Sequence, residues 1–230
     1  MASAAKRVSI AIGLWLIVLF LSSVLSAALT MYTMGSPLGV WLVPFGTHST
    51  MAILAIAFIL TSRAGLSRNC GFTLRRGIKW IRVVLWSVGV GGIAAVVGAI
   101  LPYPPIPDPF DGDLLKTILL VWIYASICEE ILVRGLVQGY LEPLRDRGLT
   151  VGGVHLSLPV ICGAILFAIM HVALLTLGAH PVQVLVVQVF ALFLGLIAGY
   201  FREASGSLIP AIMVHSIFNI MGWLIPDLIS

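Results

Sequence analysis

Three ionisable residues, Glu129, Glu130 and Arg134, lie inside an apolar stretch, residues 114–141, that otherwise has the composition of a membrane-spanning helix. A charge near the bilayer centre costs roughly 2.5–3.5 kcal/mol on insertion scales, so such residues mark functional sites or buried ion pairs. Glu130 and Arg134 are four residues apart and can pair on one helix face. Glu129 is rotated by about 100° from Glu130 and points elsewhere. The spacing therefore favours Glu129 as a general base supported by a Glu130–Arg134 pair, with a purely structural ion network as the alternative.

Two later apolar stretches carry further candidates at the same four-residue spacing, Phe167 with His171 and His215 with Asn219. Each pair occupies one helix face. With a rise of about 1.5 Å per residue, Glu129, His171, His215 and Asn219 all lie roughly 12–21 Å from the cytoplasmic end of their spans. We therefore expect these four side chains to meet in one cavity between the midplane and the cytoplasmic leaflet. A glutamate base, two histidines and an amide suit hydrolysis of an acyl bond, because they can activate water and stabilise an oxyanion.

The other three histidines are not expected to join this cluster. His48 lies in an apolar stretch among hydroxyl residues, which favours a local polar contact. His155 and His180 fall in connections between apolar stretches and are expected at the surface.

The elements that position these residues are predicted to be membrane-spanning helices. The chain of 230 residues is 60% hydrophobic and only 10% charged, against about 25% charged in soluble domains, and its mean hydropathy is +1.12. Runs of about 20 apolar residues mark bilayer spans. The sequence therefore predicts an all-α, polytopic transmembrane helix bundle of about seven spans, at 8–30, 40–61, 80–101, 114–140, 157–178, 182–200 and 208–227.

The whole chain, 1–230, is predicted to form a single integral membrane domain. Residues 1–113 contain spans without a motif, and residues 114–225 form the catalytic core. The first apolar run is much longer than the roughly 7–15 residues of a signal-peptide core, so we expect it to be an anchoring helix.

Basic residues predict the orientation of the bundle, because cytoplasmic segments are enriched in Lys and Arg. If the N-terminus is cytoplasmic, Lys116 is the only basic residue on the outer side of the membrane, and Arg134 lies within the membrane. All other basic residues then lie on the cytoplasmic side: Lys6, Arg7, Arg63, Arg68, Arg75, Arg76, Lys79, Arg82, Arg145, Arg147 and Arg202. The outer segments instead hold Asp108, Asp111, Asp113 and Asp227. We therefore interpret the net charge of +4 as a signal of membrane orientation. The expected partner is the lipid bilayer, and no nucleic-acid partner is expected.

Pairs of glycines recur at GxxxG spacing, at 135 and 139 and again at 195 and 199. Small residues at this spacing let helix backbones approach closely. We interpret them as tight packing within one bundle.

Three motifs on separate spans together resemble the signature of the CAAX protease and bacteriocin-processing (CPBP, or Abi) family of intramembrane endopeptidases: EExxxRG at 129–135, FxxxH at 167–171 and HxxxN at 215–219. The resemblance implies peptide-bond hydrolysis within the membrane, over residues 114–225. The residues that match the family's water-activating positions are Glu129 and His171. Those that match its oxyanion-stabilising positions are His215 and Asn219. Those expected to support the site are Glu130, Arg134 and Phe167.

The cofactor prediction follows from the same residues. Glu129, His171 and His215 could form a His₂Glu zinc site with an open position. However, the sequence has no HExxH motif, and asparagine is an unusual zinc ligand. A zinc-bound histidine also normally has a second-shell carboxylate, and Glu130 is expected to be committed to Arg134. We therefore expect no cofactor, with zinc as the alternative.

Two non-proteolytic functions remain open at this stage, a membrane scaffold or regulator on the same fold and a proton-coupled transporter. Intramembrane Glu and His can form proton relays, but no duplicated halves with broken helices are visible. The expected substrate is a peptide or membrane protein that enters from the inner leaflet. The expected location is a prokaryotic cytoplasmic membrane, because the chain is short and lacks long soluble extensions.

Overall fold

The computed structural model describes residues 3–62, 66–73, 77–103, 110 and 112–229. Of the charges that predict the orientation, Arg63, Arg75, Arg76, Asp108 and Asp111 lie outside the described residues.

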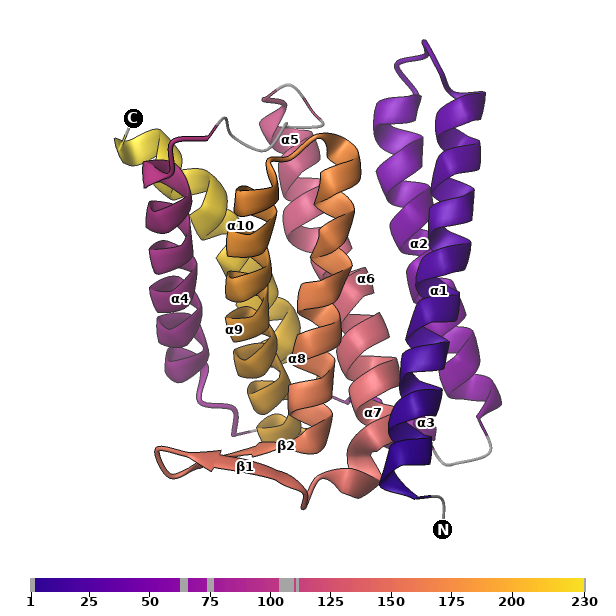
Figure 1. Ribbon diagram of the computed structural model, residues 1–230, viewed down its shortest axis with the longest axis vertical. Helices are drawn as coiled ribbons and strands as arrows, with labels where there is room; N and C mark the ends of the chain where they lie inside the picture. The colour runs from indigo at the N-terminus through magenta and orange to yellow at the C-terminus, as the bar shows by residue number, and fades with distance from the viewer. Residues whose placement is uncertain (1–2, 63–65, 74–76, 104–109, 111, 230) are drawn as a thin grey trace.

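Long apolar helices dominate the structure (Figure 1). Within the described ranges, five helical stretches are long and apolar enough to cross a membrane: α1 (Ala4–Tyr32), α2 (Gly39–Thr61), α4 (Trp80–Ile100), Leu158–Leu177 and α9 (Pro181–Ser205). The fourth of these consists of α8 (Leu158–Met170) followed by a 3₁₀ segment, η4 (His171–Leu177). The prediction of a helical, multi-pass membrane protein is thereby confirmed, and these five stretches correspond to five of the predicted spans.

The predicted span with the charged residues is a continuous helical path that changes its winding. Its segments are α5 (Leu114–Lys116), η1 (Thr117–Ala125), α6 (Ser126–Glu130), η2 (Ile131–Val137) and α7 (Gln138–Leu141). Both η1 and η2 are π-helical and flank Glu129 and Glu130 on either side. Because π-turns are rare and concentrate at functional sites, the winding of the backbone also indicates a functional site at Glu129 and Glu130.

The last helix, α10 (Ile209–Ile229), has a shorter apolar part, Ile209–Ile225. Seven spans would require that α10 and the helical path from Leu114 to Leu141 also cross the membrane. The count of seven therefore stays a prediction.

A short β-hairpin between α7 and α8 was not predicted from the sequence. Strand β1 (Gly148–Val151) pairs antiparallel with β2 (Val154–Ser157). Gly152 and Gly153 connect them with φ angles of 57° and 79°, and turns with two positive φ angles match the right-handed twist of paired strands. The hairpin is a small addition to the predicted all-α bundle, and a Gly-Gly turn between valines favours it.

Figure 1 shows how the helices are arranged around the central path. Helices α1 and α2 lie on one side of the bundle and α4 on the opposite side, with α8 and α9 between them. The N-terminus, α3 (Leu66–Asn69), α7 and the hairpin lie at one end, which we call the hairpin end. The C-terminus and α5 lie at the other end. Every residue of η2 is buried, so the core of the bundle surrounds the charged helix.

Glycines allow the closest helix contacts, as the GxxxG spacing predicts. A Cβ added at Gly195 would lie 2.8 Å from Ala164 Cα, which shows how closely α9 approaches α8. A Cβ added at Gly139 would lie 3.0 Å from the carbonyl oxygen of Asn69. The interpretation of these glycines as packing positions within one bundle is therefore confirmed.

Candidate functional site

Glu129 lies between two histidines from other helices. Its Oε1 atom is 3.4 Å from Nε2 of His48 on α2, and its Oε2 atom is 3.9 Å from Nε2 of His215 on α10. Glu129 Oε2 is buried and has no hydrogen-bond partner among the described residues. This oxygen, like Oε2 of Glu130, is therefore an acceptor that is still available for a substrate or a water molecule.

Glu130 is the centre of a second, fully buried contact network. Its Oε1 atom accepts hydrogen bonds from Arg134 Nη1 at 2.9 Å and from His215 Nδ1 at 3.0 Å. Arg134 Nη2 also donates to the carbonyl oxygen of Gly195 at 3.1 Å. The side chains of Glu130 and Arg134 are both 0% exposed. The ion pair predicted from the four-residue spacing is thus formed, and it also holds His215.

Gln138 repeats the contact to α9 one turn further along. Its Nε2 atom donates to the carbonyl oxygen of Gly199 at 3.0 Å, as Arg134 donates to Gly195. The two donors and the two glycines are each four residues apart, so the η2–α7 path and α9 are joined in register. The sequence analysis did not single out Gln138, although its four-residue spacing from Arg134 is a visible signal.

Phe167 packs between the charged residues and both predicted histidines. Its side chain is 1% exposed, and its ring meets those of His171 and His215 edge-on, with centroids 4.9 and 5.2 Å apart. The guanidinium carbon of Arg134 lies 4.6 Å from the Phe167 centroid, within cation–π range. Phe167 therefore contacts both histidines and the guanidinium of Arg134.

Asn219 reaches the charged helix from α10. Its Nδ2 atom donates to Ser126 Oγ at 3.2 Å and to the carbonyl oxygen of Val121 at 3.4 Å. Ser126 lies three residues before Glu129, so Asn219 is brought to the helix that carries the predicted base. Its amide thus bonds Ser126 and Val121 rather than Glu129 itself.

Each histidine of the cluster has its Nδ1 atom engaged. In His48 and His171, Nδ1 lies 2.7 and 2.9 Å from the backbone carbonyl oxygen four residues earlier. A carbonyl oxygen can only accept, so Nδ1 carries the proton in both rings. In His215, Nδ1 donates to the Glu130 carboxylate. In the neutral rings, Nε2 is therefore a proton acceptor in all three cases.

The contact of His48 with Glu129 corrects the sequence analysis, which placed His48 outside the cluster. The expected local contact does form, at Nδ1, but Nε2 faces the predicted base. Helix α2 is held in place next to His48, where Ser49 Oγ lies 2.7 Å from Tyr124 OH and Phe45 stacks on Tyr124 with centroids 5.0 Å apart. A run of hydroxyl residues around a histidine in an apolar helix was the available signal. Periodicity alone does not show which neighbouring helix such a face meets.

His155 and His180 lie away from the cluster, as predicted. His155 is exposed beside the hairpin, with Nε2 3.1 Å from the carbonyl oxygen of Arg145. His180 caps the start of α9 and stacks on Tyr103.

The described residues contain no group of three His, Cys, Asp or Glu side chains positioned to hold a metal ion. One argument against zinc in the sequence analysis was nevertheless wrong. Glu130 is not committed to Arg134 alone, because it also bonds His215 Nδ1. That contact is the one a second-shell carboxylate makes to a metal-bound histidine.

An apolar recess opens beside the cluster between α2 and η1. It has a volume of about 320 Å³, and its walls include Trp41, Phe45 and Tyr124. Tyr124 is about one and a half helical turns from Glu129. An apolar group held in this recess would therefore lie near the predicted base.

Adjacent carboxylates and histidines enclosed in a polytopic helical bundle are compatible with hydrolysis inside the membrane. Residues 111–221 match a family model described as Rce1-like, type II CAAX prenyl endopeptidase. The match defines the class of the chain as a CAAX-type intramembrane protease, a hydrolase.

The match over residues 111–221 supports the assignment to the CPBP family of membrane endopeptidases that the three motifs predicted. No curated protein and no solved structure matches the chain. The matched range contains every predicted site residue, whereas His48 lies outside it. The predicted division of the chain at residue 113 stays a prediction.

Proposed function

We propose that this protein is an intramembrane endopeptidase in which Glu129 activates a water molecule to attack a peptide bond. The observation that carries the proposal is the environment of Glu129 Oε2, a buried acceptor with no partner among the described residues, 3.9 Å from His215 Nε2. A polar gap of this width is commonly bridged by water. The carboxylate takes a proton from the water as the oxygen attacks the carbonyl carbon, and later returns it to the leaving amine.

His171 assists the same water in this proposal. Its Nδ1 proton is held by the carbonyl oxygen of Phe167, so Nε2 can accept a hydrogen bond. His171 also interacts electrostatically with Glu129. Two acceptors on one water orient its lone pair toward the substrate.

His215 and Asn219 stabilise the oxyanion that forms on the substrate carbonyl. Glu130 holds the His215 ring by Nδ1, so the position of Nε2 is set before substrate binds, and Nε2 donates to the oxyanion when the ring is protonated at both nitrogens. The amide contacts of Asn219 to Ser126 and Val121 are long, 3.2 and 3.4 Å. A substrate carbonyl oxygen can therefore compete for one of these N–H groups, since preorganised donors of this kind supply much of the stabilisation in acyl transfer.

His48 acts as a positioning residue in this scheme. Its Nδ1 atom is bonded to Pro44, and its Nε2 atom lies 3.4 Å from Glu129 Oε1. When the ring is protonated at both nitrogens, the Nε2 proton holds one carboxylate oxygen and leaves Oε2 directed at the water. Glu130, Arg134 and Phe167 support the site by fixing His215 and the helix that carries Glu129.

The reaction is proposed to need no metal ion, with zinc held by Glu129, His171 and His215 as the alternative. Protein side chains alone supply a base, acceptors for the water protons and oxyanion donors. No step of the scheme requires a Lewis acid.

The proposed topology has seven spans and a cytoplasmic N-terminus, with the site open toward the cytoplasmic leaflet of a prokaryotic membrane. The substrate is a peptide or membrane-protein tail. The family description points to prenylated CAAX termini, and the apolar recess beside Tyr124 suits an apolar substituent.

The test is cleavage of a fluorescence-quenched, prenylated CAAX peptide by the purified full-length chain in liposomes. We expect Glu129→Gln and His171→Ala variants to insert and fold but to lose cleavage. Glu203→Gln is a matched control, because Glu203 is a glutamate on α9 that accepts a hydrogen bond from Ser157 at the hairpin end. Full activity in both site variants would overturn the proposal and favour a scaffold or a transporter.

A further inference from the structure

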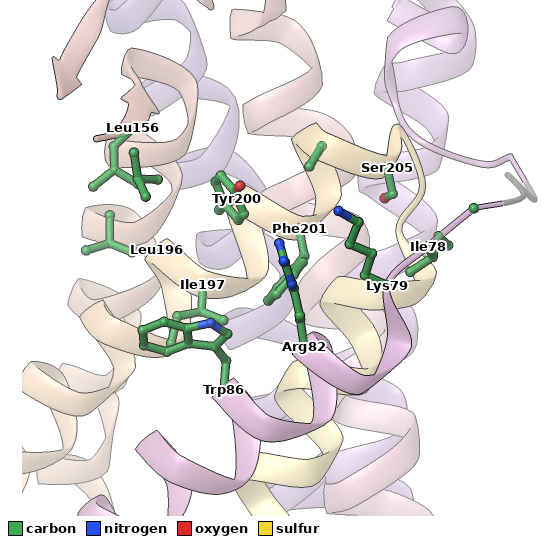
Figure 2. Close-up of a pocket in the computed structure, with 13 residues that line it drawn as sticks. Ile78, Lys79, Arg82, Trp86, Leu156, Leu196, Ile197, Tyr200, Phe201 and Ser205 are labelled. Atoms are coloured by element: carbon green, nitrogen blue, oxygen red, sulfur yellow. The ribbon is translucent and has the colours of Figure 1, made fainter. Parts of the chain in front are cut away.

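A cavity of about 660 Å³ lies at the hairpin end of the bundle, away from the Glu129 cluster. It is formed by the start of α4, the last turns of α9 and strand β2 (Figure 2). Its volume is within the range of roughly 300–1,000 Å³ that is typical of small-molecule sites. Neither the predicted site residues nor the family motifs contribute to its lining.

Two cationic side chains extend over one part of this cavity. Lys79 is the N-cap residue of α4 and Arg82 lies in its first turn, and both side chains reach toward α9 near Phe201 and Ser205 (Figure 2). Within the described residues, neither side chain has a carboxylate at ion-pair distance. This part of the cavity therefore carries two positive charges, and no acidic side chain among the described residues pairs with either of them.

The rest of the wall is apolar and follows α4 and α9 into the bundle. Trp86 lies about one turn further along α4 than Arg82 and faces Ile197, with Leu196 and Leu156 beyond it (Figure 2). Trp86 is 57% exposed. A tryptophan next to cationic groups at a helix end is typical of the membrane–water interface, where the ring sits at headgroup level.

We propose that this cavity binds an anionic phospholipid. The phosphate lies against Lys79 and Arg82, and one acyl chain lies along Trp86 and Ile197. Basic pockets between transmembrane helices on the cytoplasmic side bind anionic headgroups. A soluble anion would leave the apolar wall unused, and a basic peptide would be repelled by the two cations. The amphipathic lining thus selects an anionic lipid rather than either of these.

The bound lipid would connect elements that meet around the cavity. The first turns of α4, the end of α9 and strand β2 all contribute to its wall. Ser157, at the end of β2, also donates to Glu203 on α9. A lipid that contacts α4 and α9 together therefore stabilises the folded bundle, because a ligand bound only to the native state shifts the unfolding equilibrium.

The experiment measures lipid binding by native mass spectrometry and melting temperature in a neutral detergent. Purified full-length protein is titrated with phosphatidylglycerol, phosphatidylcholine of the same chain length, or inorganic phosphate. We expect phosphatidylglycerol to bind and to raise the melting temperature by several degrees, and the other two probes to do neither. The double variant Lys79→Gln/Arg82→Gln should lower the affinity for phosphatidylglycerol roughly 10- to 30-fold.

The matched control is Arg145→Gln/Arg147→Gln, which removes two exposed charges near the hairpin but outside the cavity. Its affinity should stay within about twofold of the unchanged chain, because it leaves both cavity cations in place. Equal losses in the two double variants would mean nonspecific attraction and would overturn the proposal. Stabilisation by inorganic phosphate alone, or by phosphatidylcholine equally, would overturn it as well.

Discussion

Nε2 of His48 lies 3.4 Å from Oε1 of Glu129, although His48 belongs to α2, outside the range that matches the family model. The neighbouring Glu130 faces the other way, to Arg134 and His215. The two adjacent glutamates thus share His215 but differ in their other partner, which is His48 for Glu129 and Arg134 for Glu130. Substitutions at the two positions should therefore have different consequences.

Glu129→Gln should abolish cleavage while leaving the fold intact, and Glu130→Gln should unfold the protein more easily. The first variant removes the proposed base, which typically lowers the rate by 10²–10⁴-fold. The second leaves Arg134 buried without a charged partner, and breaking a buried pair costs about 3–5 kcal/mol. Cleavage rate and thermal unfolding in the same detergent distinguish the two. A Glu129→Gln variant as destabilised as Glu130→Gln would contradict this division of roles.

His48→Ala should lower kcat by roughly 10- to 100-fold with little change in KM, because a misoriented carboxylate slows the chemical step more than binding. His48→Gln should recover part of the loss, since the amide can donate to Glu129. His155→Ala is the control, because His155 is exposed beside the hairpin. Equal kcat values for the Ala and Gln variants would argue against positioning by hydrogen bonding.

Gly195→Ala should destabilise the bundle by about 1–3 kcal/mol, as expected for an inserted methyl in a packed core. The added Cβ would lie 2.8 Å from Ala164 Cα and would push α9 away from α8. The same shift would lengthen the hydrogen bond from Arg134 to the Gly195 carbonyl. Gly89→Ala is the matched control, because a Cβ there meets nothing within 4 Å. Chemical denaturation of both variants compares the costs, and similar values would disprove the packing argument.

Metal removal should leave cleavage unchanged. Elemental analysis of protein purified without added metal is expected to find well below one zinc per chain, and dialysis against a chelator should not lower kcat. If activity is lost with the chelator and restored by zinc alone, the alternative ligand set of Glu129, His171 and His215 replaces the metal-free scheme.

Several features were predictable because they depend on local geometry. The Glu130–Arg134 pair follows from a spacing that puts both residues on one helix face whatever surrounds the helix. The helical spans follow from the need to satisfy every backbone hydrogen bond within a bilayer. The hairpin was not predicted, because its signal is a Gly-Gly turn in a short connection, outside the apolar runs that define the spans.

By itself, the sequence determined the membrane-spanning architecture, the order of the three motifs and the family to which they belong. Only the tertiary structure decided that His48 faces Glu129, that Glu130 also holds His215, and that Lys79 and Arg82 share a cavity with α9. The physical reason is that the regular backbone geometry of a helix sets which of its own residues align. Which faces of different helices meet depends instead on how all their side chains pack together.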